Sequence, residues 1–217
     1  MERCRGGFAT KIPLLAPVSP DIAVVPECAR PIAESDTCLW FGDNPRQGIA
    51  VTTSGEYRIH TLLTKTRVPR FVIPLQVTGP ESFTLFAVWS KSNQKYRYVT
   101  AVIEGIQKYR SLFAHSPVVV MGDLNTNLLW DSHHPKGENH TALIDLMDEL
   151  GLVSAYHQFS GEAQGCETQP TYYFLWKRER PYHIDYCFIP RPGRTVSGGS
   201  RSELTTNGSA TAITGRW

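Results

Sequence analysis

The sequence predicts an α/β domain of the α+β type, in which β-sheets are covered on both faces. Strand-like runs outnumber helical segments along the chain. Residues 22–25 and 118–121 are apolar throughout, as strands that are buried on both faces require. Residues 98–113 and 140–150 instead carry apolar side chains at helical spacing. We therefore expect sheets at the centre of the domain and helices outside them.

The expected strands are runs rich in β-branched and aromatic residues, separated by turn signals. They are residues 21–27, 48–53, 57–63, 71–77, 82–89, 118–121, 171–176 and 183–189.

Two helices are expected, and each has a one-sided apolar face. In residues 98–113 the apolar positions fall three, four and seven residues apart. The second helix, residues 140–150, is preceded by Asn139 as an N-cap candidate and followed by Gly151 as a stop signal. Both helices are predicted to pack on a sheet.

The 217 residues divide into a globular domain, residues 1–190, and a tail, residues 191–217. Overall, 41% of the residues are hydrophobic and 19% are charged, which excludes a wholly disordered chain. From residue 193 onward, however, 14 of 25 residues are Gly, Ser or Thr, so we expect this tail to be disordered.

Charge and cysteine content narrow the setting in which the protein works. No apolar run is long enough to span a bilayer, and no secretory signal is visible at the start. The five cysteines include no CxxC pair, which argues for a reducing compartment. The net charge of +2 is too small to give the whole surface a positive electrostatic potential. We expect a cytoplasmic monomer that has no membrane partner.

Acidic residues at, near or within apolar strands are the candidates for chemistry. Glu27 ends the first apolar run, Asp123 and Asn125 follow the run 118–121, and Asp185 lies inside the last expected strand. Carboxylates are rarely buried without a partner, so their recurrence in this context indicates a shared site. Oxygen ligands without a Cys/His cluster suit Mg²⁺, or alternatively Mn²⁺.

Three segments in this order resemble the endonuclease/exonuclease/phosphatase superfamily. They are the strand with its glutamate at 21–27, the Gly-Asp-Leu-Asn segment at 122–125 and the His-Ile-Asp-Tyr segment at 183–186. The resemblance implies a four-layer sandwich of two mixed β-sheets flanked by helices. It also implies metal-dependent hydrolysis of phosphate esters.

The resemblance further implies a role for each matching residue. Glu27 would be the Mg²⁺ ligand, and Asp123 would orient or deprotonate the attacking water. Asn125 would hydrogen-bond the scissile phosphate, and Asp185 would hold the general-base histidine. Such roles meet the needs of phosphodiester hydrolysis, which are charge neutralisation and a positioned water.

Two further residues are expected to bind substrate. His183 could line the pocket, because it belongs to the last motif. Arg46 could supply positive charge for an anionic substrate. So could the basic side chains of the loop before that motif, which are Lys177, Arg178 and Arg180.

The sequence departs from the family pattern at both ends, so we expect the fold to be incomplete there. Arg3 stands where the family has a first-strand asparagine, and no Asp or His follows Asp185 where a Ser-Asp-His motif is usual. The strand ending at Trp89 lacks the family's frequent terminal histidine, and Trp89 is expected to be a packing residue.

These patterns predict a Mg²⁺-dependent phosphoesterase-type domain. It would act on phosphodiesters of nucleic acid, or alternatively on phosphomonoesters, with impaired turnover because the general base has no counterpart. One alternative is a non-catalytic module that binds metal or phosphate. Another is a truncated, inactive gene product.

Overall fold

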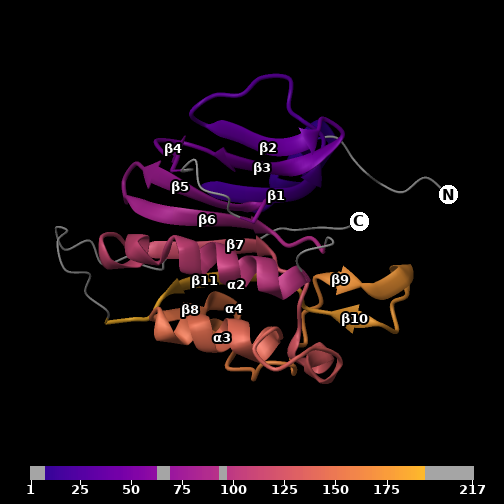
Figure 1. Ribbon diagram of the computed structural model, residues 1–217. Helices are drawn as coiled ribbons and strands as arrows, with labels where there is room; N and C mark the ends of the chain where they lie inside the picture. The colour runs from indigo at the N-terminus through magenta and orange to yellow at the C-terminus, as the bar shows by residue number, and fades with distance from the viewer. Residues whose placement is uncertain (1–7, 63–68, 93–96, 194–217) are drawn as a thin grey trace.

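Two β-sheets lie face to face, with helices outside them (Figure 1). The computed structural model describes residues 8–62, 69–92 and 97–193. Arg3 and residues 194–217, which include most of the expected tail, lie outside the described residues. The predicted α/β sandwich is confirmed.

The smaller sheet has three antiparallel strands in the order β1-β3-β2. They are β1 (Ile22–Cys28), β2 (Cys38–Asn44) and β3 (Gln47–Thr53). The sequence analysis did not predict β2, whose inward and outward positions do not alternate cleanly. In this edge strand only Trp40 is fully buried.

The larger sheet is mixed and has six strands in the order β4-β5-β6-β7-β11-β8. They are β4 (Arg58–Thr61), β5 (Val72–Thr78), β6 (Phe83–Trp89), β7 (Val118–Asp123), β11 (Asp185–Pro190) and β8 (Leu152–Ser154). Among the strands that the structure describes, only β6 and β7 pair in parallel, and the chain between them contains α2 (Tyr98–Lys108).

The helices on the outer face of the larger sheet are those that the sequence predicts. Helix α2 is followed by the 3-10 turn η2 (Arg110–Ala114), so the expected helix changes geometry at Tyr109. In α3 (His140–Glu149), Asn139 is the N-cap, because its Oδ1 accepts a hydrogen bond from the backbone N–H of Ala142 at 3.1 Å.

Short elements complete the described chain. They are α1 (Phe8–Lys11), η1 (Ile12–Leu15), η3 (Leu128–His133), α4 (Ala155–Ser160), β9 (Tyr172–Tyr173), η4 (Phe174–Trp176) and β10 (Pro181–Tyr182). The strand expected at 171–176 is therefore a two-residue strand followed by a 3-10 turn. Among the described residues, no helix is long and apolar enough to cross a membrane.

Three clusters of buried side chains separate four layers. One lies between the two sheets and includes Val24 and Trp89. A second lies between the larger sheet and helices α2 and α3, around Phe86. A third lies between the smaller sheet and the N-terminal helical turns, around Trp40. Trp89 is only 1% exposed, which confirms its predicted packing role.

Candidate functional site

Asp123 and Asp185 face each other across two neighbouring strands. Asp123 ends β7, Asp185 begins β11, and the antiparallel register pairs them directly. The next pair along is hydrogen-bonded, since the N–H of Leu124 donates to the carbonyl of Ile184 at 2.9 Å. The two aspartates thus form the kind of pair in which side chains lie closest. Both are buried, at 2% and 5% exposed.

Gly122 explains how β7 can bring Asp123 beside β6. Its φ is +144°, in the region that favours glycine, and an added Cβ would lie 1.9 Å from the carbonyl oxygen of Val88. This close approach aligns the end of β6 with the end of β7, where the N–H of Ser90 donates to the carbonyl of Asp123 at 2.7 Å.

Asn125 is held beside Asp123 by a tight turn. Its φ is +48°, a conformation that asparagine tolerates better than most residues. Its N–H donates to Oδ1 of Asp123 at 2.9 Å, and its Nδ2 donates to the carbonyl of Ser90 at 2.9 Å. The turn therefore orients both the Asp123 carboxylate and the Asn125 carboxamide.

Glu27 lies at a β-bulge in the other sheet. The pairing of β1 with β3 shifts between Val25 and Cys28, and Glu27 has a φ of +53°. Val25 and Cys28 both pack in the outer cluster although they are three residues apart. The extra residue of the bulge is what turns Glu27 away from that outer face.

Arg46 lies close to the residues that follow Glu27. It is an exposed residue of the β2–β3 turn, where its N–H donates to Oδ1 of Asn44 at 3.0 Å. The same turn is tied to the chain beyond β1, because the N–H of Arg30 donates to the carbonyl of Pro45 at 2.8 Å. Pairing thus brings Arg46 and Glu27 to one end of the smaller sheet.

His183 is buried, with 6% of its surface exposed. Its Nδ1 lies 2.8 Å from the carbonyl oxygen of Gln169, and since a carbonyl only accepts, Nδ1 carries the proton. Its ring packs against Tyr156 and Tyr186, at centroid distances of 4.5 Å and 4.9 Å. The ring is therefore enclosed by aromatic side chains, and its predicted role in binding substrate stays a prediction.

The donor chemistry of the predicted site fits magnesium, which takes one or two carboxylates and completes its shell with water and phosphate oxygens. Glu27, Asp123 and Asp185 offer only oxygen ligands. In the described part of the chain, no three or more His, Cys, Asp or Glu side chains form a ready metal cage. An ion here would depend on water and substrate for much of its shell.

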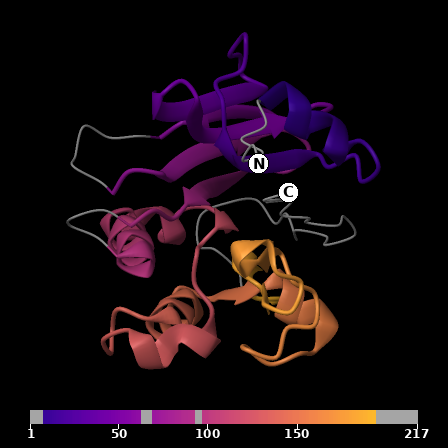
Figure 2. The same ribbon diagram turned by 90° about the vertical axis from the view of Figure 1, so that its right-hand side faces the viewer.

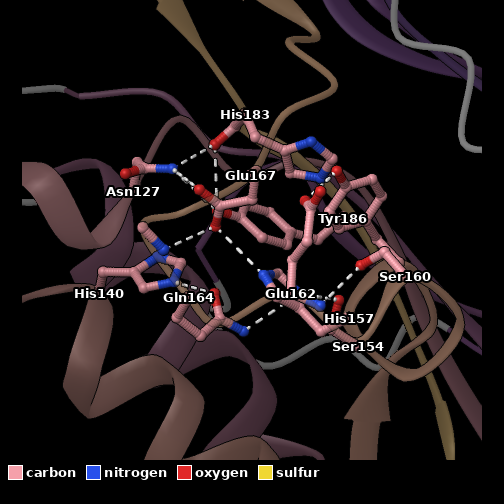
Figure 3. A network of polar contacts seen from close by, with 12 residues as sticks. Asn127, His140, Ser154, His157, Ser160, Glu162, Gln164, Glu167, His183 and Tyr186 are labelled. Atoms are coloured by element: carbon pink, nitrogen blue, oxygen red, sulfur yellow. Dashed lines mark hydrogen bonds and ion pairs between the residues drawn. The ribbon is translucent and has the colours of Figure 1, made fainter.

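A buried polar network around Glu167 was missed by the sequence analysis (Figure 3). The side chain of Glu167 is 2% exposed, and its Oε1 accepts from Nε2 of His157 at 3.2 Å. Its Oε2 accepts from Nδ2 of Asn127 at 3.2 Å. We call Glu167, Asn127 and His157 the Glu167 cluster. No motif or period marks these residues, which come from three separate segments.

In both Glu167 and His157, burial and hydrogen bonding shift the pKa in opposite directions. Burial favours a raised pKa for Glu167, but the N–H groups of Gly165 and Glu167 and the side chains of Asn127 and His157 outweigh it and lower the pKa. Burial lowers the pKa of His157, although its hydrogen bond to Glu167 opposes the shift. An ionised Glu167 beside a neutral His157 follows at neutral pH.

The β9–β10 hairpin carries exposed apolar side chains that sequence reasoning did not single out. Four side chains near its tip are at least 40% exposed, and they are Tyr173, Phe174, Leu175 and Trp176. The hairpin stands beside the sandwich in Figure 1, and in Figure 2 the orange segment that contains it lies to one side of α2 and α3. Large exposed apolar groups in one place are typical of interaction surfaces.

Lys91 is a further cation near the aspartates. Its Nζ lies 4.3 Å from the ring centroid of Trp89, the residue that pairs with Asp123 in the parallel register. It also lies 5.8 Å from the ring centroid of Phe71. The rings hold its ammonium group near the end of β6.

No family model and no curated protein matches the sequence. Solved structures do match. The endonuclease domain of TRAS1, a telomere-specific non-LTR retrotransposon, is 14% identical with a TM-score of 0.55, over 86% of this chain and 81% of that one. The 3'-5' exonuclease NExo from Neisseria meningitidis is 16% identical with a TM-score of 0.57, over 85% of this chain and 83% of that one.

Truncated TDP2 from Caenorhabditis elegans is 13% identical with a TM-score of 0.51, over 82% of this chain and 73% of that one. Sequence identities this low show a shared fold alone. The described chain therefore shares the fold of these three proteins, which agrees with the sandwich that the resemblance implies.

Proposed function

We propose that this domain is a phosphoesterase that hydrolyses phosphodiester bonds of nucleic acid. The observation that carries the proposal is the pairing of Asp123 with Asp185 at the ends of two strands, with Asn125 hydrogen-bonded to the first. Buried carboxylates beside a positioned amide are suited to orienting water and a phosphate group.

Each residue has a proposed task. Asp123 orients the attacking water and takes its proton, and Asn125 hydrogen-bonds a non-bridging phosphate oxygen. Asp185 supports the group that serves as general base. Glu27 binds Mg²⁺, or Mn²⁺ in its place, which supplies charge neutralisation at the phosphate when bound. Arg46 adds positive charge beside Glu27.

Nucleic acid is favoured over a small phosphomonoester by the β9–β10 hairpin. Its exposed Trp176 is followed by Lys177, Arg178 and Arg180. Aromatic faces that stack on bases, next to cations that bind backbone phosphates, are the usual elements of nucleic-acid surfaces. The structural neighbours include a 3' phosphatase bound to a product DNA hairpin, which is consistent with this substrate class.

Hydrolysis by these 217 residues is proposed to be slow. Residues 186–217 contain no Asp or His, so this part of the chain supplies no counterpart of the expected general base. General-base catalysis typically contributes about 10²–10⁴-fold.

The four described cysteines, Cys28, Cys38, Cys166 and Cys187, are free, which supports a reducing cytoplasmic setting.

The test is turnover of DNA, RNA and a generic phosphodiester by the purified chain with Mg²⁺ or Mn²⁺. Asp123→Asn keeps the side-chain shape and should lower any turnover by about 100-fold or more. Asp145→Asn, on the exposed side of α3, is the matched control and should leave the rate unchanged. Turnover that survives Asp123→Asn would refute the site.

Calorimetry with Mg²⁺ and oligonucleotides separates the catalytic proposal from its alternatives. Binding without turnover would favour the non-catalytic module. Absence of both binding and turnover, with a poorly cooperative thermal transition, would favour the inactive gene product.

A further inference from the structure

We propose that Glu167 is a positioning residue that fixes the segment after Asp123 relative to the start of β11. This inference rests on the proposed function of the Asp123–Asp185 site. In this role Glu167 does not contact the substrate itself. Glu167 acts through Asn127 on one side and through the loop of residues 161–171 on the other.

The first step is the contact between Glu167 and Asn127. Asn127 is 1% exposed and lies two residues beyond Asn125. Its Nδ2 donates both to Oε2 of Glu167 at 3.2 Å and to the carbonyl of His183 at 2.9 Å (Figure 3). One amide group thus connects the chain that leaves β7, the chain that enters β11 and the carboxylate.

The second step is the other side of the Asn127 amide. Its Oδ1 accepts from the N–H of Leu129 at 3.0 Å and thereby caps η3. The hydroxyl of Tyr186 donates to the same carbonyl of His183 at 3.0 Å. Since both sides of this amide are engaged, Asn127 cannot rotate without losing buried hydrogen bonds.

The third step runs through the loop that carries Glu167. Its carboxylate is pinned by His157 of α4 and by the N–H of Gly165, at 2.9 Å. The loop ends at Thr171, whose Oγ1 accepts from the N–H of Ile184 at 3.0 Å and from the N–H of Asp185 at 3.2 Å. The loop that carries Glu167 is therefore also hydrogen-bonded to the backbone of Asp185.

A role in stability alone would give a different pattern of effects, and the loop offers a matched control. Glu162 holds the same loop with comparable contacts, accepting from the hydroxyl of Tyr156 and from the N–H and hydroxyl of Thr168. Within the part of the chain that the structure describes, Glu162 makes no direct hydrogen bond or ion pair to β7 or β11. Because Glu162 does not contact Asn127, loosening the loop at Glu162 should leave the hydrogen bond between Asn127 and the carbonyl of His183 in place.

The test is amide hydrogen exchange of the full-length chain, read at Ile184 and Asp185. Glu167→Ala should speed exchange of both amides by about tenfold, because a buried hydrogen-bond network is lost. Glu162→Ala should change them by less than about twofold. Glu167→Gln is the milder variant if Glu167→Ala does not fold, and Thr171→Val should reproduce the effect directly.

A reciprocal exchange provides a rescue. Asn127→Asp alone opposes two carboxylates, and Glu167→Gln alone opposes two donors. In the double variant the glutamine amide can donate to the new carboxylate, while its oxygen still accepts from His157 and Gly165. Exchange at Ile184 and Asp185 in the double variant should be slower than in Asn127→Asp alone, but faster than in the wild type, because an aspartate at position 127 cannot donate to the carbonyl of His183.

Where the chain turns over substrate, Glu167→Ala should lower kcat by about tenfold with KM changed by less than about threefold, since the binding surface is untouched. Exchange at Ile184 unchanged in Glu167→Ala, or raised equally in Glu162→Ala, would overturn the proposal. A wild-type chain without turnover would count against the proposed function, while the exchange result would still decide the role of Glu167.

Discussion

Replacing Gly122 with alanine is the sharpest perturbation that the structure offers near the site. Gly122 precedes Asp123 in β7 and lies opposite Val88 of β6. Its φ of +144° is a conformation that other residues rarely adopt. An alanine Cβ would also lie 1.9 Å from the Val88 carbonyl oxygen, where ordinary contact begins near 3.4 Å.

The expected cost combines two effects. A non-glycine residue in such a conformation costs about 1–3 kcal/mol. Relieving the overlap requires β6 to retreat by about 1.5 Å, which stretches the neighbouring ladder hydrogen bonds beyond bonding distance. Each bond lost costs roughly 1 kcal/mol, so the loss of two adds about 2 kcal/mol. We therefore expect Gly122→Ala to lower the free energy of unfolding by about 3–5 kcal/mol.

Thermal and urea unfolding measure this loss. For a chain of this size, 1 kcal/mol corresponds to about 2–4 °C, so Tm should fall by roughly 10 °C. Gly137→Ala is the matched control, because Gly137 also has a positive φ, of +85°, but no atom within 4 Å of the added Cβ. It should cost only about 1 kcal/mol.

A loss of stability in Gly122→Ala no greater than that in Gly137→Ala would refute the reasoning. It would mean that β6 and β7 are not as closely apposed at Val88 as the structure has them. The alignment of Ser90 with Asp123, on which the orientation of Asn125 depends, would then also be in question.

The remaining predictions concern pH and thiol chemistry. Because the pKa of His157 is lowered in the folded state, stability should begin to fall as pH drops below its unfolded value of 6.5. The lowered pKa of Glu167 adds stability that is present above pH 4.5 and lost as pH falls through the folded pKa. Urea midpoints should therefore decline below pH 6.5 and again below pH 4.5, and a flat profile in a scan from pH 8 to 3 would contradict both. Burial raises the pKa of Cys187 to about 12 and of Cys28 to about 11, so iodoacetamide at pH 8 should alkylate exposed Cys166 well before either. Peptide mass spectrometry measures the order, and equal labelling of Cys187 in the native protein would contradict its burial in β11.

Sequence patterns were sufficient where local chemistry decides the structure. The apolar run 118–121 became the central strand β7, and the spacing of apolar residues in 140–150 became α3 with Asn139 as its cap. The motif containing Asp123 and Asn125 folds into a turn whose main hydrogen bond spans only two residues. Short-range signals of this kind survive in almost any tertiary context.

Patterns failed where partners are distant in sequence. Nothing near Glu167 marks it as buried, because its contact with Asn127 spans 40 residues and depends on how α4 and β11 pack. The bulge at Glu27 likewise depends on its pairing with β3 rather than on its own sequence.

The sequence by itself determined which acidic residues lie in or beside the apolar strands and what chemistry they could supply. Tertiary structure alone decided that Asp123 and Asp185 pair across one ladder, and that Glu167 links the segments around them. The physical reason is that strand register and buried hydrogen bonds join residues far apart in the chain, and these are fixed only when the layers pack together.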